Sequence, residues 1–165
     1  MSGLIEAYLD VETTGLSPSY SDITVIGIHL VNGAQNSLVQ LVGGDVTRDN
    51  ILESLEGVHI IYTYNGSRFD LPFIHCCVGA DLEKSFHHHD LMYDCWRCNL
   101  RGGLKAVECQ LGISRKLKGI GGFEAVILWR RYQYDGDSNA LAMLLQYNKE
   151  DVINLPILRE RLNVK

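Results

Sequence analysis

The sequence predicts an α/β domain built around a mixed β-sheet. Residues 4–42 contain three stretches rich in β-branched and alternating apolar residues, separated by turn sequences, which predict an antiparallel meander. Beyond residue 42, short apolar stretches alternate with helical patterns, and the longest helical pattern covers about residues 138–162. No internal repeat, low-complexity tract or linker divides the 165 residues, so we expect one domain spanning 1–165.

Composition excludes several classes of protein. Hydrophobic residues make up 46% and charged residues 21%, which is typical of a globular domain. No apolar run approaches the roughly 18 residues of a membrane span. The first residues also show no basic segment followed by an apolar one. The five cysteines include an adjacent pair, Cys76 and Cys77, and do not predict a disulfide framework. We therefore expect a cytoplasmic protein without membrane contact.

The charge is unevenly distributed along the chain. Residues 97–131 hold eight basic and two acidic residues, a net charge of +6, within a chain whose overall charge is -5. A basic segment beside acidic residues suits a protein that holds a polyanion together with metal ions. Solvated helix faces would give the same pattern, so charge alone leaves both interpretations open.

The first strand, within residues 4–15, ends in two acidic residues. Successive side chains of a strand point to opposite faces, so Asp10 and Glu12 project side by side with Tyr8. Two adjacent carboxylates are tolerated if both face bulk water, if one is protonated, or if a cation lies between them. An acidic strand end at the surface is the simplest explanation for such a pair in isolation.

The elements after the first strand are predicted by local signals. A second strand covers residues 23–31, the pair Asn32 and Gly33 marks a hairpin, and a third strand lies at about residues 37–42. The later expected elements are a helix at 47–56 capped by Thr47, strands at 58–64 and 86–91, and helices at about 91–99, 103–111 and 124–132.

Two more acidic residues have informative positions. Pro72 belongs in a helix only within its first turn, so Asp70 lies at or next to a helix start, where a helix cap is its simplest role. Asp151 occupies a position on the apolar stripe of the last helix, a stripe made by Leu144, Tyr147, Asp151, Leu155, Leu158 and Leu162. A carboxylate buried there requires a cation, a hydrogen-bond partner or a shifted pKa.

Other potential metal ligands are the run His87–His89 and the pair Cys95 and Cys98. In a strand the histidines alternate between faces, and no second ligand cluster accompanies them, so metal binding is not the favoured interpretation. A zinc or redox role for the two cysteines stays open.

Three segments carry a resemblance to a known family. They are Asp10-Val-Glu12-Thr-Thr-Gly15-Leu16, Asn65-Gly-Ser-Arg-Phe69-Asp70 and Tyr147-Asn-Lys-Glu-Asp151. In this order they resemble the motifs of the DEDD 3′–5′ exonucleases of the ribonuclease H-like superfamily, in the subgroup with a catalytic tyrosine. The second has the form found in proofreading domains of family B DNA polymerases. Gly102-Gly-Leu-Lys-Ala-Val-Glu108, followed by Leu111-Gly-Ile, further resembles small stand-alone members of the superfamily.

The resemblance implies a fold and a set of roles. The fold is a five-stranded mixed sheet, antiparallel in strands 1–3 and then parallel, flanked by helices. Two divalent cations, Mg²⁺ or Mn²⁺, would be held by Asp10, Glu12, Asp70 and Asp151, and Tyr147 would orient the attacking water as an ordinary phenol. The residues that would meet the nucleic acid strand are Thr13, Gly15, Leu16, Asn65 and Phe69.

The expected function is a metal-dependent 3′–5′ exonuclease acting on the 3′ ends of single-stranded DNA or RNA. We expect the basic segment at 97–131 to carry the upstream backbone. The alternatives are an endonuclease that uses the same metal site on RNA–DNA hybrids or branched DNA, and a nucleic-acid-binding module without activity.

Overall fold

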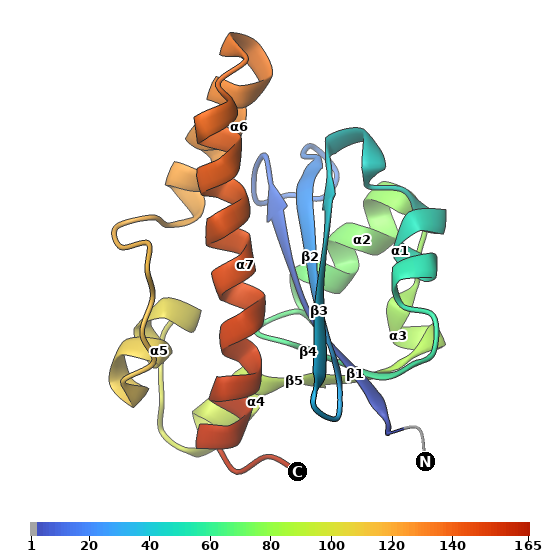
Figure 1. The fold of residues 1–165 in the computed structure, drawn as a ribbon, viewed down its shortest axis with the longest axis vertical. Coiled ribbons are helices and arrows are strands. Elements are labelled where there is room, and N and C mark those ends of the chain that lie inside the picture. Colours follow the sequence, from blue (N-terminus) through green and yellow to red (C-terminus); the bar gives the residue numbers. More distant parts are fainter. Residues whose placement is uncertain (1–2) are drawn as a thin grey trace.

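The computed structural model describes residues 3–165 and contains a five-stranded mixed sheet in the order β3-β2-β1-β4-β5 (Figure 1). The strands are β1 Ile5–Thr13, β2 Ile23–Asn32, β3 Gln35–Val42, β4 Val58–Thr63 and β5 His87–Asp90. The first three pair antiparallel, while β4 pairs parallel with both β1 and β5. The predicted ribonuclease H-like sheet is therefore confirmed.

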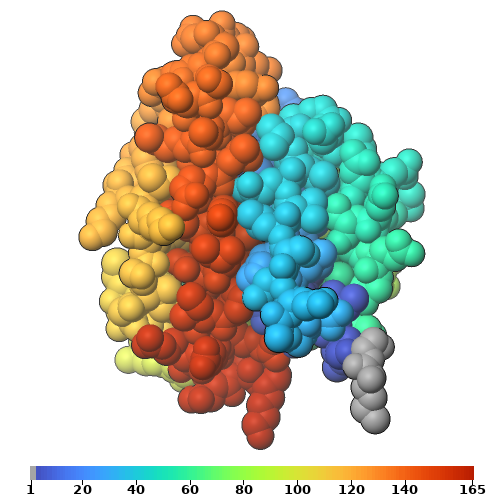
Figure 2. Space-filling model, viewed as in Figure 1, coloured from blue at the N-terminus to red at the C-terminus, as the bar shows by residue number. Residues whose placement is uncertain are grey.

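Helices cover both faces of this sheet. They are η1 Gly43–Asp45, α1 Arg48–Ser54, α2 Asp70–Val78, α3 Leu82–Ser85, α4 Leu91–Arg97, α5 Leu104–Leu111, α6 Gly122–Asp135 and α7 Ser138–Arg161. One face packs against α1, α2 and α3, and the other packs against α4 to α7 (Figure 1). On the surface in Figure 2, α7 lies directly beside β3. No helix within residues 3–165 is both long and apolar enough to cross a bilayer.

The side chains of β1 alternate between these two layers as predicted. Ala7, Leu9 and Val11 pack into the cluster with α1 to α3, whereas Tyr8 packs on the opposite face with α4, α5 and α7. Asp10 and Glu12 follow Tyr8 on that opposite face. The pairing of β1 with β2 is irregular between Glu12 and Thr13: Glu12 pairs with Val25 and Thr13 with Ile23, so Thr24 of β2 is the extra residue of a β-bulge next to the two acidic residues.

The apolar stripe of α7 is also confirmed. Leu144 and Tyr147 join an apolar cluster with α6, and Leu155 and Leu158 join another with α4 and α5. Asp151 lies between these clusters and is only 4% exposed. The helix thus places a carboxylate against the acidic end of β1.

Two short helices were not predicted from the sequence. η1 and α3 have three and four residues, too few to produce a periodic apolar pattern. Asp81 caps the start of α3, because its carboxylate accepts a hydrogen bond from the Lys84 amide at 3.3 Å. Thr47 caps α1 in the same way through the Asn50 amide at 3.2 Å, as predicted.

Candidate metal centre and nucleic-acid cleft

A cleft of about 850 Å³ opens where the end of β1 meets α7, with the β1–β2 turn, the start of α2 and one face of α6 as its walls. The residues predicted for chemistry and for strand binding all line it: Asp10, Glu12, Thr13, Gly15, Leu16, Asn65, Phe69, Asp70, Tyr147 and Asp151. Segments far apart in the sequence therefore converge on one site.

Three of the predicted carboxylates form a compact group. Asp10, Glu12 and Asp151 each offer an oxygen within 4.8 Å of the others. Glu12 is 7% exposed and Asp151 is 4% exposed, so bulk water does not separate their charges. The pair on β1 is therefore not a surface feature, and the third carboxylate reaches it from α7.

Burial raises the pKa of both carboxyls on β1. The nearby charge of Asp151 raises the pKa of Asp10 and of Glu12 further. One oxygen of Glu12, Oε1, is buried and has no hydrogen-bond partner among the described residues. A hard divalent cation satisfies both features, because it neutralises adjacent carboxylates and binds an unpartnered oxygen. Asp10, Glu12 and Asp151 could therefore hold a metal ion.

Asp70 lies in the cleft but outside the compact group. It is the first residue of α2 and is 3% exposed. Its Oδ1 accepts a hydrogen bond from the Val11 amide at 2.9 Å, which ties the start of α2 to β1. Burial raises the pKa of Asp70, and the bond from Val11 opposes this shift. The helix-cap interpretation is wrong, because Phe69 occupies the N-cap position.

The turn before Asp70 is held by Asp90, a residue that sequence reasoning missed. The Asp90 carboxylate accepts hydrogen bonds from the amides of Asn65 at 2.7 Å and Ser67 at 3.1 Å. Asn65 has a φ of 62°, in the left-handed region that Asn tolerates better than most residues. Asp90 thereby stabilises the conformation that turns Asn65 toward the cleft, and no local sequence signal links the two residues.

Two cations of the chain lie against Asp151. The Arg115 guanidinium bonds to Asp151 and to Glu108, and the Lys105 ammonium lies 3.4 Å from Asp151 Oδ1. Burial lowers the pKa of Arg115, but the bonds to Glu108 and Asp151 outweigh this effect and raise it. Asp151 therefore has the partners that its burial requires, and one of them is a buried arginine.

Tyr147 lies beside Asp151 beneath these cations. Its ring centroid is 4.4 Å from the Lys105 ammonium, and its side chain is 4% exposed. Burial raises the pKa of Tyr147 above its ordinary value, and the neighbouring carboxylates raise it further. Treating this side chain as an ordinary phenol was therefore wrong: it is a weaker acid, and it stays protonated at neutral pH.

The basic residues of the segment at 97–131 differ in burial and in their ion pairs. Arg115 is buried in its ion pairs, while Arg97 pairs with Asp94 and Arg131 pairs with Asp137. The basic residues of this segment that line the cleft are Lys105 and Arg130. The buried Arg115 is thus not available to a nucleic acid backbone, whereas for the exposed basic residues the expectation that they carry the upstream backbone stays a prediction.

The histidine run has partners within the fold. His88 Nε2 lies 2.9 Å from the Thr63 hydroxyl, and His89 Nε2 lies 2.5 Å from the Asp94 carboxylate. Cys95 is buried and Cys98 is exposed. Within residues 3–165, the group at Asp10 is the one place where three or more possible ligand atoms cluster.

The sequence profile of the RNase H superfamily matches residues 7–163. This chain belongs to the RNase H superfamily. The match covers β1 through α7, including every strand of the sheet and all the acidic residues of the cleft. Curated protein sequences give no match to the chain.

Solved structures with the same fold include a polymerase and a nuclease. The family B DNA polymerase of the archaeon Pyrobaculum calidifontis superposes with a TM-score of 0.70 at 16% identity, over 97% of this chain and 24% of the polymerase. Brucella melitensis NrnC bound to pGG gives a TM-score of 0.66 at 22% identity, over 96% of this chain and 71% of NrnC. The Mg²⁺-bound form of NrnC gives a TM-score of 0.65 at 20% identity, with the same coverage. The chain thus spans about a quarter of the polymerase.

Proposed function

We propose that this protein is a metal-dependent 3′–5′ exonuclease that hydrolyses single-stranded DNA or RNA from the 3′ end and releases nucleoside monophosphates. The observation that carries the proposal is the group formed by Asp10, Glu12 and Asp151 on the floor of a cleft. All the positions expected to hold the strand end line the same cleft. NrnC, which has this fold, has been seen with Mg²⁺ and with pGG, and both observations agree with the proposal.

The carboxylates would hold two divalent cations, Mg²⁺ or Mn²⁺. Asp10, Glu12 and Asp151 would hold the first, since Glu12 Oε1 has no hydrogen-bond partner within residues 3–165. Asp70 and Asp10 would serve the second, because Asp70 lines the same cleft with one oxygen engaged by the Val11 amide. When bound, such cations activate a water molecule and stabilise charge on the phosphodiester.

Two further side chains act on the reacting groups in this proposal. The protonated Tyr147 donates a hydrogen bond that orients the attacking water, since its raised pKa makes it unsuited to remove a proton. Lys105 lines the cleft with its ammonium next to Asp151, so its charge can attract the scissile phosphate.

The 3′-terminal nucleotide would lie between the β1–β2 turn and the start of α2. The Thr13 hydroxyl donates to the Gly15 carbonyl at 2.6 Å and so stabilises the turn that presents Leu16, a side chain that is 87% exposed. Phe69 and Asn65 line the cleft with this turn. An exposed leucine and an aromatic ring suit base stacking, and the Asn65 amide suits a polar contact to the strand.

A digestion assay tests the reaction. A 5′-labelled single strand of DNA or RNA is incubated with the protein and either Mg²⁺ or Mn²⁺, and products are resolved by length. We expect a ladder that shortens from the 3′ end, together with free nucleoside monophosphates.

A circular single strand serves as the control substrate, because it has no 3′ end at which an exonuclease could start. Cutting of the circle would refute the exonuclease and favour an endonuclease on the same metal site. Inactivity on DNA and RNA with both metals would favour a nucleic-acid-binding module.

A further inference from the structure

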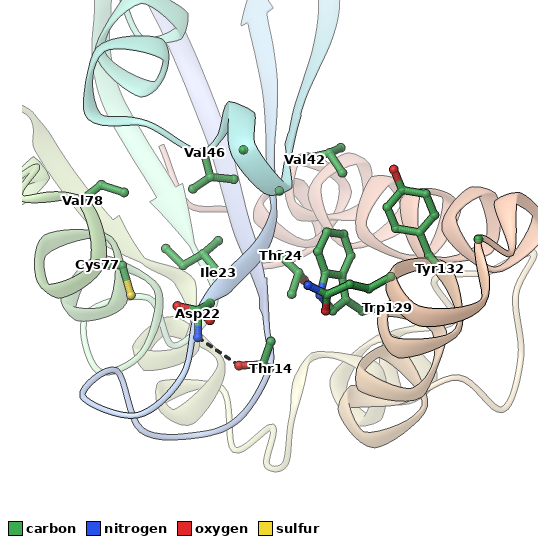
Figure 3. Close-up of a pocket in the computed structure, with 14 residues that line it drawn as sticks. Thr14, Asp22, Ile23, Thr24, Val42, Val46, Cys77, Val78, Trp129 and Tyr132 are labelled. Atoms are coloured by element: carbon green, nitrogen blue, oxygen red, sulfur yellow. Dashed lines mark hydrogen bonds between the residues drawn. The ribbon is translucent and has the colours of Figure 1, made fainter.

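A second cavity of about 810 Å³ lies beside the cleft, between the β1–β2 turn, η1 and the later part of α6 (Figure 3). None of the chemistry proposed above uses it. Its walls include Thr14 and Asp22 from the two ends of the turn, and Trp129, Tyr132 and Gln133 from α6.

The second cavity adjoins the cleft. Thr14 lines both hollows. Helix α6 is a wall of both as well: Phe123, Ile127 and Arg130 line the cleft, and Tyr132 and Gln133 line the second cavity further along the helix. At 1.5 Å per residue, these positions extend over about 15 Å of helix axis. The two sets of positions lie about a third of a turn apart around the helix, so a strand that leaves the cleft along α6 turns around the helix to reach the second cavity.

The lining of the second cavity suits a nucleobase. Tyr132 is partly exposed and offers its ring, backed by the buried ring of Trp129 at a centroid distance of 5.5 Å, and Figure 3 shows both across from Asp22 and Thr14. Asp22 and Gln133 supply hydrogen-bond acceptors and donors of the kind that read exocyclic amino groups and ring nitrogens of bases. Within residues 3–165 the lining includes no lysine, arginine or histidine, so a phosphate finds no cation there.

A cation suited to a phosphate lies on the cleft face of α6, close in sequence to the residues of the second cavity. Arg130 is exposed, lines the cleft, and forms no ion pair with any residue from 3 to 165. Its neighbour Arg131 is instead engaged by Asp137. A backbone phosphate at Arg130 would leave the neighbouring base free to enter the second cavity.

We propose that the second cavity binds a nucleobase of the same single strand whose 3′ end occupies the cleft. This inference rests on the proposed function, and it extends the binding site beyond the nucleotides next to the scissile bond. The protein accordingly binds longer strands more tightly than dinucleotides, because only a longer strand fills both hollows.

Binding to strands of graded length tests the proposal. Fluorescein-labelled oligoadenylates of two to eight nucleotides, as DNA and as RNA, are titrated with the Asp10→Asn variant in Mg²⁺, and anisotropy gives each Kd. We expect this variant to leave the strands intact, because it lacks a carboxylate of the compact group. We expect the Kd to fall at least about 10-fold between two and six nucleotides, the effect of one stacked base.

Variants of α6 test whether the higher affinity for longer strands comes from the second cavity. In the same background, Tyr132→Ala and Gln133→Ala should remove most of the gain and leave the dinucleotide Kd unchanged. Gln133 is exposed, so its variant tests the contact even if loss of Tyr132 perturbs folding. Tyr134→Ala is the matched control, because Tyr134 is 78% exposed on the same helix and lines neither hollow.

A Kd that does not depend on length, or a gain that survives both variants, would overturn the proposal. Weaker binding of free adenosine monophosphate in Gln133→Ala, with the length gain intact, would also overturn it and assign the cavity to released product. If the protein lacks the proposed exonuclease activity, the digestion assay with the wild-type protein shows this independently of the binding measurements.

Discussion

The Asn148 side chain joins α7 to the central metal-binding carboxylate of the proposed site. Its Nδ2 lies 3.3 Å from the Asp10 carbonyl oxygen and 3.3 Å from Asp10 Oδ2, and its Oδ1 accepts a hydrogen bond from Gln40 at 3.0 Å. Gly27 makes room for it, because a Cβ there would lie 2.2 Å from Asn148 Oδ1. A fully buried amide thus fixes the Asp10 carboxylate beside the acidic group.

Loss of this amide should weaken metal binding. We expect Asn148→Ala to raise the Kd for Mn²⁺ by about 10- to 100-fold, since groups that orient metal ligands typically contribute that much. Electron paramagnetic resonance of free Mn²⁺ gives the Kd. Lys149→Ala, at the exposed neighbouring position, should leave it unchanged. An unchanged Kd in Asn148→Ala, together with a lower Tm, would mean that Asn148 only stabilises the fold.

The carboxylates and the tyrosine should respond differently to substitution. We expect Asp10→Ala and Asp151→Ala to abolish turnover, because each removes a ligand from the compact group. In the proposed reaction Tyr147→Phe would remove only the hydrogen bond that orients water, so it should slow turnover by about 10²-fold, the scale of a misplaced reacting group. Single-turnover rates on a labelled strand measure both effects. Full activity of Asp151→Ala would refute the role assigned to α7.

Local patterns predicted the elements that carry these residues. The two-residue period of β1 placed Asp10 and Glu12 on one face, and the stripe of α7 placed Asp151 in the core. Their immediate surroundings could not be predicted in this way. Arg115 pairs with Asp151 across 36 positions, and Asn148 bonds Asp10 across 138 positions. Such pairs depend on how loops and helices pack, and the charge of Arg115 suggested a solvent-facing role instead.

Stability should depend on pH and on metal together. Burial and mutual repulsion raise the pKa of Asp10, Glu12 and Asp70 in the folded protein. Above about pH 4, where unfolded carboxyls lose their protons, the folded state binds more protons than the unfolded state, so stability falls as pH rises. We therefore expect the Tm in EDTA to be lower at pH 8 than at pH 5.

A divalent cation should reverse this loss by replacing the missing protons. Mn²⁺ is expected to raise the Tm more at pH 8 than at pH 5, because binding requires deprotonated carboxylates. Differential scanning calorimetry measures both shifts. The double variant Asp10→Asn, Glu12→Gln should show a weaker dependence on pH and a small response to Mn²⁺. Equal Mn²⁺ shifts at both pH values would contradict the linkage.

Arg115 should stabilise the metal-free protein through its two acidic partners. Its side chain is 9% exposed, and it bonds to Glu108 and Asp151, whose side chains are 1% and 6% exposed. Arg115→Met leaves both carboxylates buried without their shared cation, which should lower the free energy of unfolding by about 3–5 kcal/mol. Urea denaturation in EDTA measures this loss. Arg130→Met, at an exposed position without an ion pair among residues 3–165, should change it by only about 0.5 kcal/mol.

Unfolding in saturating Mn²⁺ shows whether Arg115→Met destabilises the protein through lost packing or through the loss of a positive charge beside Asp151. A cation bound at Asp151 supplies part of the charge that Arg115→Met removes, so the destabilisation should be smaller in Mn²⁺ than in EDTA. Adding Glu108→Gln to Arg115→Met should restore further stability, because it removes the charge of Glu108, which has no other ion-pair partner among residues 3–165, whereas Asp151 keeps Lys105. If the loss is the same with and without Mn²⁺, Arg115 acts through packing alone, and its charge is not linked to the metal centre.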